Sequence, residues 1–345
     1  MNSSARYNFS RVLVAVVVSL FAICVFIPLL YDIAGVRTNL EERLAPTLVA
    51  QIRRSTRVPR TRTLTREMEI PPTALSATEI PAVPLPTVSA LNGIPIARLV
   101  LISESTSIHL RDIYALGQSL GRNPRAISKV GDSTMVYPPF LATFDRKDYR
   151  LGQFAYLQST IDFHAGSFGR ESVAVKKGMH TWSQFNPAWA IPELCLPDEG
   201  PLECELRLQN PSIAIIRLGA NDTELPREFE RQLGAIVKFC LARGIIPVLG
   251  TKPDRYEGAS NLINNIIRKT ASAYSIPLWD YDLIAGTIPG RGLEPDGLHM
   301  KGGGTRDFSS RAAMQAGDAL EDLTALMLLD AIRREIGAES LAAKK

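Results

Sequence analysis

The sequence predicts an α/β domain in which helices cover both faces of a parallel sheet of about five strands, preceded by one transmembrane helix. Three observations lead to this prediction. After Gly93, short apolar segments alternate with amphipathic stretches, which is the rhythm of a βα chain. Each of those apolar segments ends in a small or polar residue. Near the N-terminus, one apolar stretch carries no charge over 20 residues.

The uncharged stretch runs from Val12 to Tyr31 and has the length that an α-helix needs to cross a bilayer. Arg6 and Arg11 precede it, and cationic residues favour keeping that end in the cytoplasm. We therefore expect a cytoplasmic N-terminus over 1–11, a signal-anchor helix over 12–31 and a single-pass protein of the cell membrane with its body outside the cytoplasm. A cleaved signal peptide is the alternative, but the apolar run exceeds the usual length of roughly 7 to 15 residues, and no A-x-A site closes it.

Residues 32–92 have the composition of a linker. An Arg- and Thr-rich run, RRSTRVPRTRTLTRE, is followed by the Pro-rich tract PPTALSATEIPAVPLPT, and no hydrophobic period persists in either. The first 70 residues hold ten Arg and five acidic residues, so the rest of the chain is nearly neutral. A nucleic-acid-binding body would carry its own basic stripe, and we therefore expect no nucleic-acid partner.

The folded domain is expected over residues 93–340. Helices are predicted at about 106–120, 224–243, 259–275 and 305–336, and strands over 126–130, 171–177, 212–218, 245–250 and 276–281. Open α/β sheets place their sites at the carboxyl ends of the strands. The polar residues that follow these strands are therefore the first candidates for a functional site.

The first candidate is Gly131-Asp132-Ser133, directly after the strand at 126–130. This position predicts a serine on a strand-to-loop turn with its hydroxyl exposed. A turn without a catalytic role is the alternative, since Gly, Asp and Ser all favour turns.

The second candidate is the pair Asp296 and His299, late in the chain in a loop rich in Gly and Pro. Ester hydrolysis by a serine needs a base to take its proton, and that base needs an orienting carboxylate. An Asp three residues before a His on one loop can meet the second ring nitrogen. A loop His that only caps the following helix is the alternative.

The third candidate is Gly219-Ala220-Asn221-Asp222, at the end of the most apolar predicted strand. The amide of Asn221 is suited to donate to the negative oxygen of a tetrahedral intermediate. An Asn-Asp cap on the following helix is the alternative. On the same strand, Arg217 is expected to be buried and paired with a carboxylate, rather than to meet an anionic substrate group.

In this order, and each at a strand end, the three motifs resemble those of the SGNH, or GDSL-like, hydrolase family over roughly residues 125–310. The resemblance implies a flavodoxin-like α/β/α sandwich and a serine esterase with Ser133, Asp296 and His299 as catalytic residues. It also implies an oxyanion hole made by Ser133, Gly178 and Asn221. Two departures concern the residue after the serine, which is Thr134 where the family often has Leu, and the glycine block VKKGMHT, which lacks the usual Asn and second Gly.

The expected substrate is an O-acyl ester of a small molecule, a lipid or an envelope polysaccharide. Two alternatives stay open: an O-acyltransferase acting on envelope polysaccharide, and a non-catalytic binding protein on the same fold. No cofactor is expected, and the spacing of Asp, His and Cys predicts no metal site. Cys195 and Cys204 flank a short loop and are a candidate disulfide in an exported domain, with two unpaired thiols as the alternative.

Overall fold

The computed structural model of the chain describes residues 88–137 and 139–338. The predicted membrane helix at 12–31 and nearly all of the predicted linker lie outside the described residues. Within the described ranges, no helix combines the length and the apolar character needed to span a membrane.

A five-stranded sheet in the order β3-β7-β6-β5-β4 forms the centre of the domain. Four strands are parallel, and β3 joins β7 in the antiparallel direction. The predicted α/β class is therefore confirmed, with a correction at one edge: β3 precedes the first crossover helix, so nothing constrains it to run parallel. The strands are β3 (Val100–Leu101), β4 (Asn123–Gly131), β5 (Pro211–Arg217), β6 (Ile246–Gly250) and β7 (Leu278–Trp279), and a separate small hairpin joins β1 (Ala90–Leu91) to β2 (Ile94–Pro95).

The prediction of a strand at 171–177 is wrong. Only Val175 pairs with the sheet, through one parallel bridge to Gly131 on the outer side of β4. Ser172 turns its hydroxyl onto the Lys129 carbonyl at 2.6 Å, which interrupts a regular ladder. Val175 still occupies the place of a second strand, so the parallel segments follow the 2-1-3-4-5 order of flavodoxin-like sheets. In such sheets, ligands bind where the strand order reverses, which here lies between β4 and β5.

Helices flank the sheet on both faces. Three of the four predicted helices correspond to α3, α7 and α8, but α10 begins at Gly317 rather than near residue 305. Upstream of α10, the Asp307 carboxylate accepts hydrogen bonds from the backbone N–H and hydroxyl of Ser309, which compete with helical bonds. The helices are α2 (Ile96–Leu99), α3 (Glu104–Ser119), α4 (Thr143–Arg146), α5 (Gln158–Phe163), α6 (Pro201–Gln209), α7 (Pro226–Leu241), α8 (Leu262–Ala273), α9 (Tyr281–Ala285) and α10 (Gly317–Glu335).

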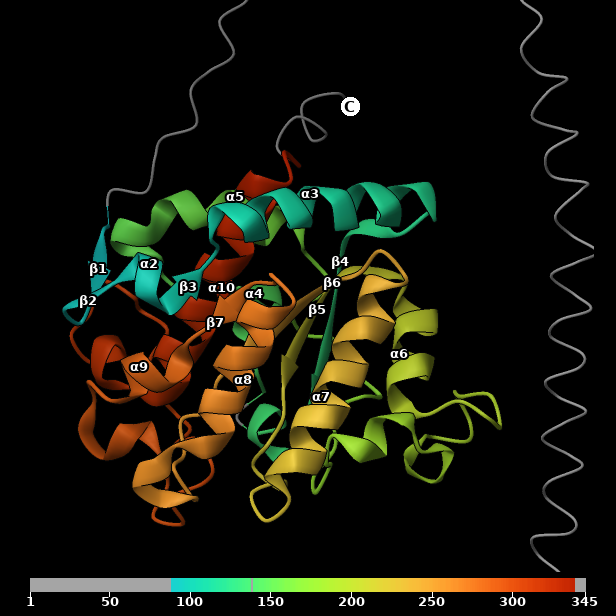
Figure 1. Cartoon of the computed structure of the whole chain (residues 1–345). Helices are drawn as coiled ribbons and strands as arrows, with labels where there is room; N and C mark the ends of the chain where they lie inside the picture. Colours follow the sequence, from blue (N-terminus) through green and yellow to red (C-terminus); the bar gives the residue numbers. More distant parts are fainter. Residues whose placement is uncertain (1–87, 138, 339–345) are drawn as a thin grey trace, which may run out of the picture. The chain divides into compact units, whose positions relative to one another are not determined.

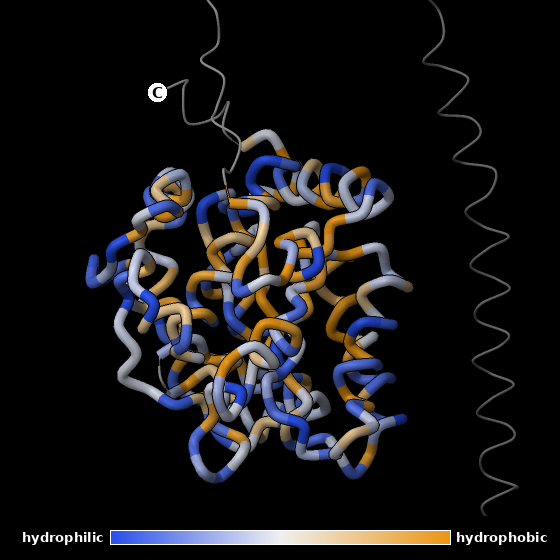
Figure 2. Tube along the Cα trace, turned by 90° about the vertical axis from the view of Figure 1, so that its left-hand side faces the viewer, coloured by the Kyte–Doolittle hydropathy of each residue, from blue (hydrophilic) through white to orange (hydrophobic). Residues whose placement is uncertain are grey.

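The hydrophobic core has two parts, one on each face of the sheet. Ile213 and Ile215 of β5 pack with apolar residues of α3, α5 and α10, whereas Ala214 and Ile216 pack with those of α6, α7 and α8. This alternation follows the two-residue period of a strand that is covered on both faces. Figure 1 shows α6, α7 and α8 together on one side of the sheet, and Figure 2 shows hydrophobic segments running through the interior. Both faces of the sheet are thus covered, which leaves the loops at the carboxyl ends of its strands to form a site.

Candidate active site

Three neighbouring backbone segments bring the predicted residues to the carboxyl edge of the sheet. Gly131, at the end of β4, pairs with Arg217 of β5 on one side and with Val175 on the other. Each predicted residue follows one of these three paired residues: Ser133 comes two residues after Gly131, Gly178 three after Val175 and Asn221 four after Arg217. Because neighbouring strands are only about 4.8 Å apart, Ser133, Gly178 and Asn221 are grouped at the place where the strand order reverses.

Ser133 opens a short 3-10 turn (Ser133–Met135) that Asp132 stabilises. The Asp132 carboxylate accepts hydrogen bonds from the backbone N–H of Thr134 at 2.9 Å and from its hydroxyl at 2.7 Å. Gly131 is required before this turn, since a Cβ there would lie 2.3 Å from the Met135 sulfur and 3.0 Å from the Arg217 carbonyl oxygen. Ser133 is 8% exposed as a whole residue, and its hydroxyl contacts the imidazole of His299.

A continuous chain of hydrogen bonds joins Ser133, His299 and Asp296. Ser133 Oγ lies 3.0 Å from His299 Nε2, and His299 Nδ1 lies 2.7 Å from Asp296 Oδ2. With the Nδ1 proton donated to the carboxylate, Nε2 is left to accept the serine proton. This arrangement of nucleophile, base and orienting acid is the one that activates a serine hydroxyl.

The loop that carries Asp296 and His299 is closed by its own backbone. Leu293 and Met300 form an antiparallel bridge, and the Glu294 N–H donates to the His299 carbonyl at 2.8 Å. The second oxygen of Asp296 accepts the backbone N–H groups of residues 298 and 299 at 2.9 and 3.0 Å. These contacts hold the imidazole in one position, so the alternative of a simple helix cap does not describe His299.

The charge of Asp296 is stabilised by its hydrogen bonds. The bond from His299, together with the two backbone N–H groups, lowers the pKa of the Asp296 carboxyl to about 2. The side chains of Asp296 and His299 are 50% and 36% exposed, so water reaches this side of the site. The base is therefore oriented by a carboxylate that remains ionised at every pH in the physiological range.

The predicted oxyanion donors are Ser133, Gly178 and Asn221. Among the described residues, no acceptor is paired with the backbone N–H of Ser133 or of Gly178. Asn221 Nδ2 donates to the Met179 carbonyl at 2.8 Å, and because an amide nitrogen carries two hydrogens, one is left for a substrate. Asn221 does not cap α7, which begins at Pro226 without a side-chain cap.

The turn before Asn221 depends on Gly219. Its φ is +120°, and a Cβ there would lie 2.6 Å from the Ile263 side chain. Asp222, the next residue of the motif, accepts the backbone N–H and the hydroxyl of Thr181, with the hydroxyl at 3.0 Å. Asn221 and Asp222 thus both attach the glycine loop around Gly178 to the end of β5.

Arg217 is buried beneath the serine turn, as predicted, and is 1% exposed. Its guanidinium pairs with Glu321 of α10 and donates to the Thr134 carbonyl at 2.6 Å. Burial raises the pKa of Glu321 to about 7, while the charge of Arg217 opposes that shift. Glu321 was not identified from the sequence as the partner of Arg217, although an acidic residue within an apolar helix indicates a buried ion pair. This contact ties the serine turn to the last helix.

Three further features concern the segment after β6, the cysteines and metal binding. Lys252 is fully buried and paired at 2.6 Å with both Asp254 and Glu257, so the segment after β6 forms an internal ion-pair turn. Cys195 and Cys204 form a disulfide bond. In the part of the chain that the structure describes, no group of three His, Cys, Asp or Glu side chains is placed to hold a metal ion.

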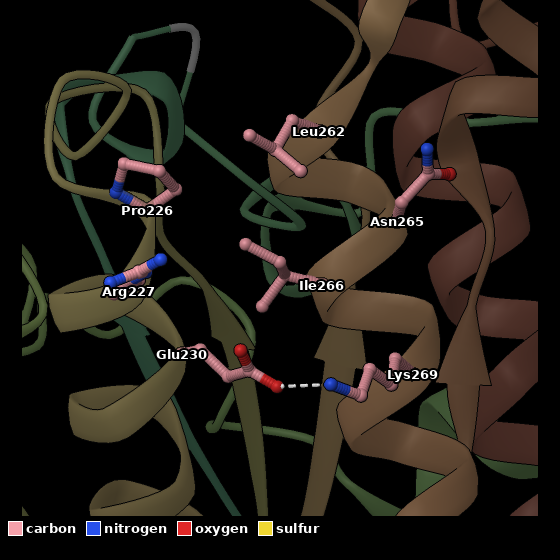
Figure 3. Close-up of a pocket in the computed structure, with 7 residues that line it drawn as sticks. All are labelled: Pro226, Arg227, Glu230, Leu262, Asn265, Ile266 and Lys269. Carbon is pink, nitrogen blue, oxygen red and sulfur yellow. Dashed lines mark hydrogen bonds and ion pairs between the residues drawn. The ribbon is translucent and has the colours of Figure 1, made fainter.

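A hollow of about 400 Å³ lies between α7 and α8. Figure 3 shows an ion pair, Glu230 with Lys269 at 2.7 Å, that crosses it. None of the predicted catalytic or oxyanion residues lines this hollow, so it is separate from the serine site. Its lining consists of Pro226, Arg227, Glu230, Leu262, Asn265, Ile266 and Lys269.

Comparison with known proteins finds no matching family model and no matching curated protein. Among solved structures, the chain resembles one named as a putative lipolytic protein of the G-D-S-L family from Desulfitobacterium hafniense. The two are 15% identical, the match covers 59% of this chain and 99% of that one, and the TM-score is 0.37. It also resembles TesA, at 16% identity over 60% of this chain and 99% of TesA, with a TM-score of 0.41. A third similar structure is the psychrotrophic esterase EstA from Pseudoalteromonas sp., at 15% identity over 59% of this chain and 98% of EstA, with a TM-score of 0.36.

One of these neighbours is named as a lipolytic protein of the G-D-S-L family, the family whose motifs the sequence resembles, and another is named as an esterase. At identities of 15–16% and TM-scores of 0.36–0.41, likeness does not carry a function from one protein to another. The function of this chain is therefore to be inferred from its own site, which joins a serine, an imidazole and a carboxylate at the reversal point of an α/β sheet.

Proposed function

We propose that the chain is a serine ester hydrolase that acts on an O-acyl ester through an acyl-enzyme. The observation that carries this proposal is the hydrogen-bond chain from Ser133 to His299 to Asp296, with distances of 3.0 and 2.7 Å. The backbone N–H groups of Ser133 and Gly178 and one amide hydrogen of Asn221 have no other acceptor among the described residues, and they support the proposal as oxyanion donors. A nucleophile, a base and oxyanion donors are the complete set that acyl transfer requires.

In the first half-reaction, His299 Nε2 takes the proton of the Ser133 hydroxyl while Oγ bonds to the ester carbonyl carbon. The carbonyl π electrons move to oxygen, and the Ser133 N–H, the Gly178 N–H and the Asn221 amide hold that oxyanion. When the intermediate collapses, the bond to the alcohol oxygen breaks, and the protonated imidazole returns its proton to the leaving alcohol. Asp296 stabilises the imidazolium that forms between these two proton transfers.

In the second half-reaction, water replaces the alcohol. His299 takes a proton from water as its oxygen attacks the acyl-enzyme, and collapse releases the carboxylic acid and restores the Ser133 hydroxyl. The partial exposure of His299 and Asp296 favours water as the acceptor, since solvent reaches the base directly. An O-acyltransferase uses the same acyl-enzyme, with a sugar hydroxyl in place of water.

The proposed location is the outer face of the cell membrane. Its support is the uncharged stretch at 12–31 with Arg6 and Arg11 on its N-terminal side. A tether of the composition found at 32–92 would let the domain reach esters at some distance from the bilayer.

Labelling with a fluorophosphonate probe tests the proposed function. The full-length protein in detergent should react with the probe, and Ser133→Ala should abolish labelling without lowering the melting temperature. Labelling that survives in Ser133→Ala would place the nucleophile elsewhere. A folded wild-type protein that does not react would instead support a non-catalytic binding protein. Product analysis with a sugar acceptor then separates hydrolysis from acyl transfer.

A further inference from the structure

Two of the chain's three tryptophans lie beside the glycine loop and, with a histidine, form what we call the aromatic platform: His180, Trp182 and Trp189. The His180 and Trp182 rings are stacked, with centroids 5.7 Å apart, and Trp182 meets Trp189 edge to face at 5.9 Å. The ammonium of Lys176 lies 5.8 Å from the Trp189 ring centroid. The platform begins at His180, two residues after Gly178, a proposed oxyanion donor.

The platform keeps a large aromatic surface in contact with water. Trp182 is 38% exposed, and the His180 side chain is 34% exposed. Exposed aromatic clusters of this kind are characteristic of surfaces that receive a ligand. Nothing in the proposed acyl-transfer chemistry uses these rings, so they are available for substrate binding.

Hydrogen bonds attach the platform to the site on two sides. On one side, Gln184 Nε2 donates at 3.0 Å to the Ala174 carbonyl. The same carbonyl accepts at 3.0 Å the N–H of Gly131, which precedes Ser133 by two residues. On the other side, the Asp222 carboxylate accepts a hydrogen bond from the Thr181 hydroxyl and lies 3.6 Å from His180 Nδ1. The platform is therefore positioned by the same backbone segments that position the nucleophile and the oxyanion donors.

The disulfide supports this segment from outside. Gly200 lies within the loop closed by Cys195 and Cys204, and a Cβ on it would be 2.6 Å from backbone atoms of Gln184 and Phe185. This close approach packs the disulfide loop directly against the 3-10 turn that carries Trp182 (Trp182–Phe185). A segment held in this way is pre-organised for binding.

We propose that the aromatic platform binds the sugar ring of an O-acylated saccharide whose ester lies at Ser133; this inference rests on the proposed esterase function. A pyranose ring presents C–H groups on its faces, which pack on the electron-rich face of an aromatic ring, and hydroxyls at its edge. The Lys176 ammonium lies over the Trp189 ring, and the His180 imidazole is stacked on Trp182, so a cation and a ring N–H are close to a sugar bound on these rings. An alkyl chain would instead require an enclosed apolar groove, and these rings are open to water and flanked by a cation.

The test compares a cyclic and an acyclic acetyl ester. β-D-Glucose pentaacetate carries acetyl esters on one pyranose ring and has no free hydroxyl, so it tests stacking of the sugar ring alone, whereas triacetin has three acetyl esters and no ring. Acetate release by the full-length protein in detergent is followed in a pH-stat. For Trp182→Ala, kcat/KM on the pentaacetate should fall about 10-fold, mainly through KM, while kcat/KM on triacetin stays within about twofold. Trp182→Phe, which keeps a ring, should lose less.

The matched control is Tyr256→Ala, which removes a 71% exposed aromatic ring from the loop after β6. It should leave both rates unchanged. Equal losses on the two esters in Trp182→Ala, or no loss on either, would overturn the proposal. With methyl octanoate as a third substrate, a loss of acid release confined to that ester would also overturn the proposal and would assign the rings to an acyl chain.

Binding separates this inference from the proposed function. Calorimetric titration of Ser133→Ala with the pentaacetate should show binding that weakens about 10-fold when Trp182→Ala is added. If the wild-type protein releases no acetate from either ester, the esterase function fails, but a Trp182-dependent affinity would still support the platform. If acetate is released and the affinity does not depend on Trp182, the platform proposal fails alone.

Discussion

His299 Nε2 lies 3.0 Å from Ser133 Oγ, although 166 residues separate the two in the chain. Each residue comes from its own loop, and each loop is closed by local hydrogen bonds: Asp132 stabilises the serine turn, and Asp296 stabilises the histidine loop. The serine loop follows β4 and the histidine loop precedes α10, so the contact between them depends on how α10 packs against the sheet. The predictions that follow test each part of this arrangement.

Replacing Asp296 by Asn should lower kcat on a simple acetyl ester by roughly 10⁴-fold, since the amide favours the wrong imidazole tautomer. The measurement is steady-state hydrolysis, with the melting temperature as a check on folding. Asp307→Asn is the matched control, because Asp307 is a half-buried Asp whose carboxylate bonds only to nearby Ser309 among the hydrogen bonds described. An Asp296→Asn variant with full kcat would exclude the carboxylate from the mechanism.

Asp296 should also make stability depend on pH in the acid range. Its folded pKa of about 2 lies below the ordinary value, so its stabilising effect is complete above the unfolded pKa of about 4 and is lost as the pH falls toward 2. Urea denaturation of wild type and Asp296→Asn at pH 5 and at pH 2.5 measures this. The difference in unfolding free energy should shrink at the lower pH, and a difference that stays constant would contradict it.

Asn221→Ala should lower kcat by roughly 10²- to 10³-fold and change KM little, because an oxyanion donor acts mainly in the transition state. Asn265→Ala on α8 provides the control, since that side chain lies in the separate hollow between α7 and α8. A rise in KM with unchanged kcat would show that Asn221 binds the ground state instead.

Arg217→Met should destabilise the fold by about 3–5 kcal/mol, because it leaves Glu321 buried without its partner and removes the donor to the Thr134 carbonyl. The double variant Arg217→Met with Glu321→Leu should recover much of that loss in urea denaturation. If catalysis stays low in the recovered double variant, the bond to Thr134 positions the serine turn. If the single variant is as stable as wild type, the ion pair does not support this part of the fold.

Changing Cys195 and Cys204 to Ser should lower the unfolding free energy by about 2–3 kcal/mol, the value expected for a short closed loop. Cys240 is buried and free, so it provides an internal control in thiol titration. In denaturant, the wild-type chain should show two reactive thiols, those of Cys24 and Cys240, and four once a reductant is added. A chain in which Cys195 and Cys204 react without reductant would contradict the bond.

The sequence by itself determined the α/β class, four of the five strands and the polar residues that end them. Those features are local: the two-residue period of Ile213–Ile216 and the turn residues around Ser133 and His299 act over a few neighbours. The resemblance of three motifs to a known family then indicated that Ser133, Asp296 and His299 form one catalytic site.

Tertiary structure alone decided the rest. The segment at 171–177 has strand-forming residues, but Ser172 bonds across to Lys129 and leaves only Val175 in the sheet. The partner of Arg217, the start of α10 and the grouping of His180, Trp182 and Trp189 also depend on packing between distant segments. Local patterns carry no information about which distant residues will meet, because that choice is made by the burial and hydrogen bonding of the whole domain.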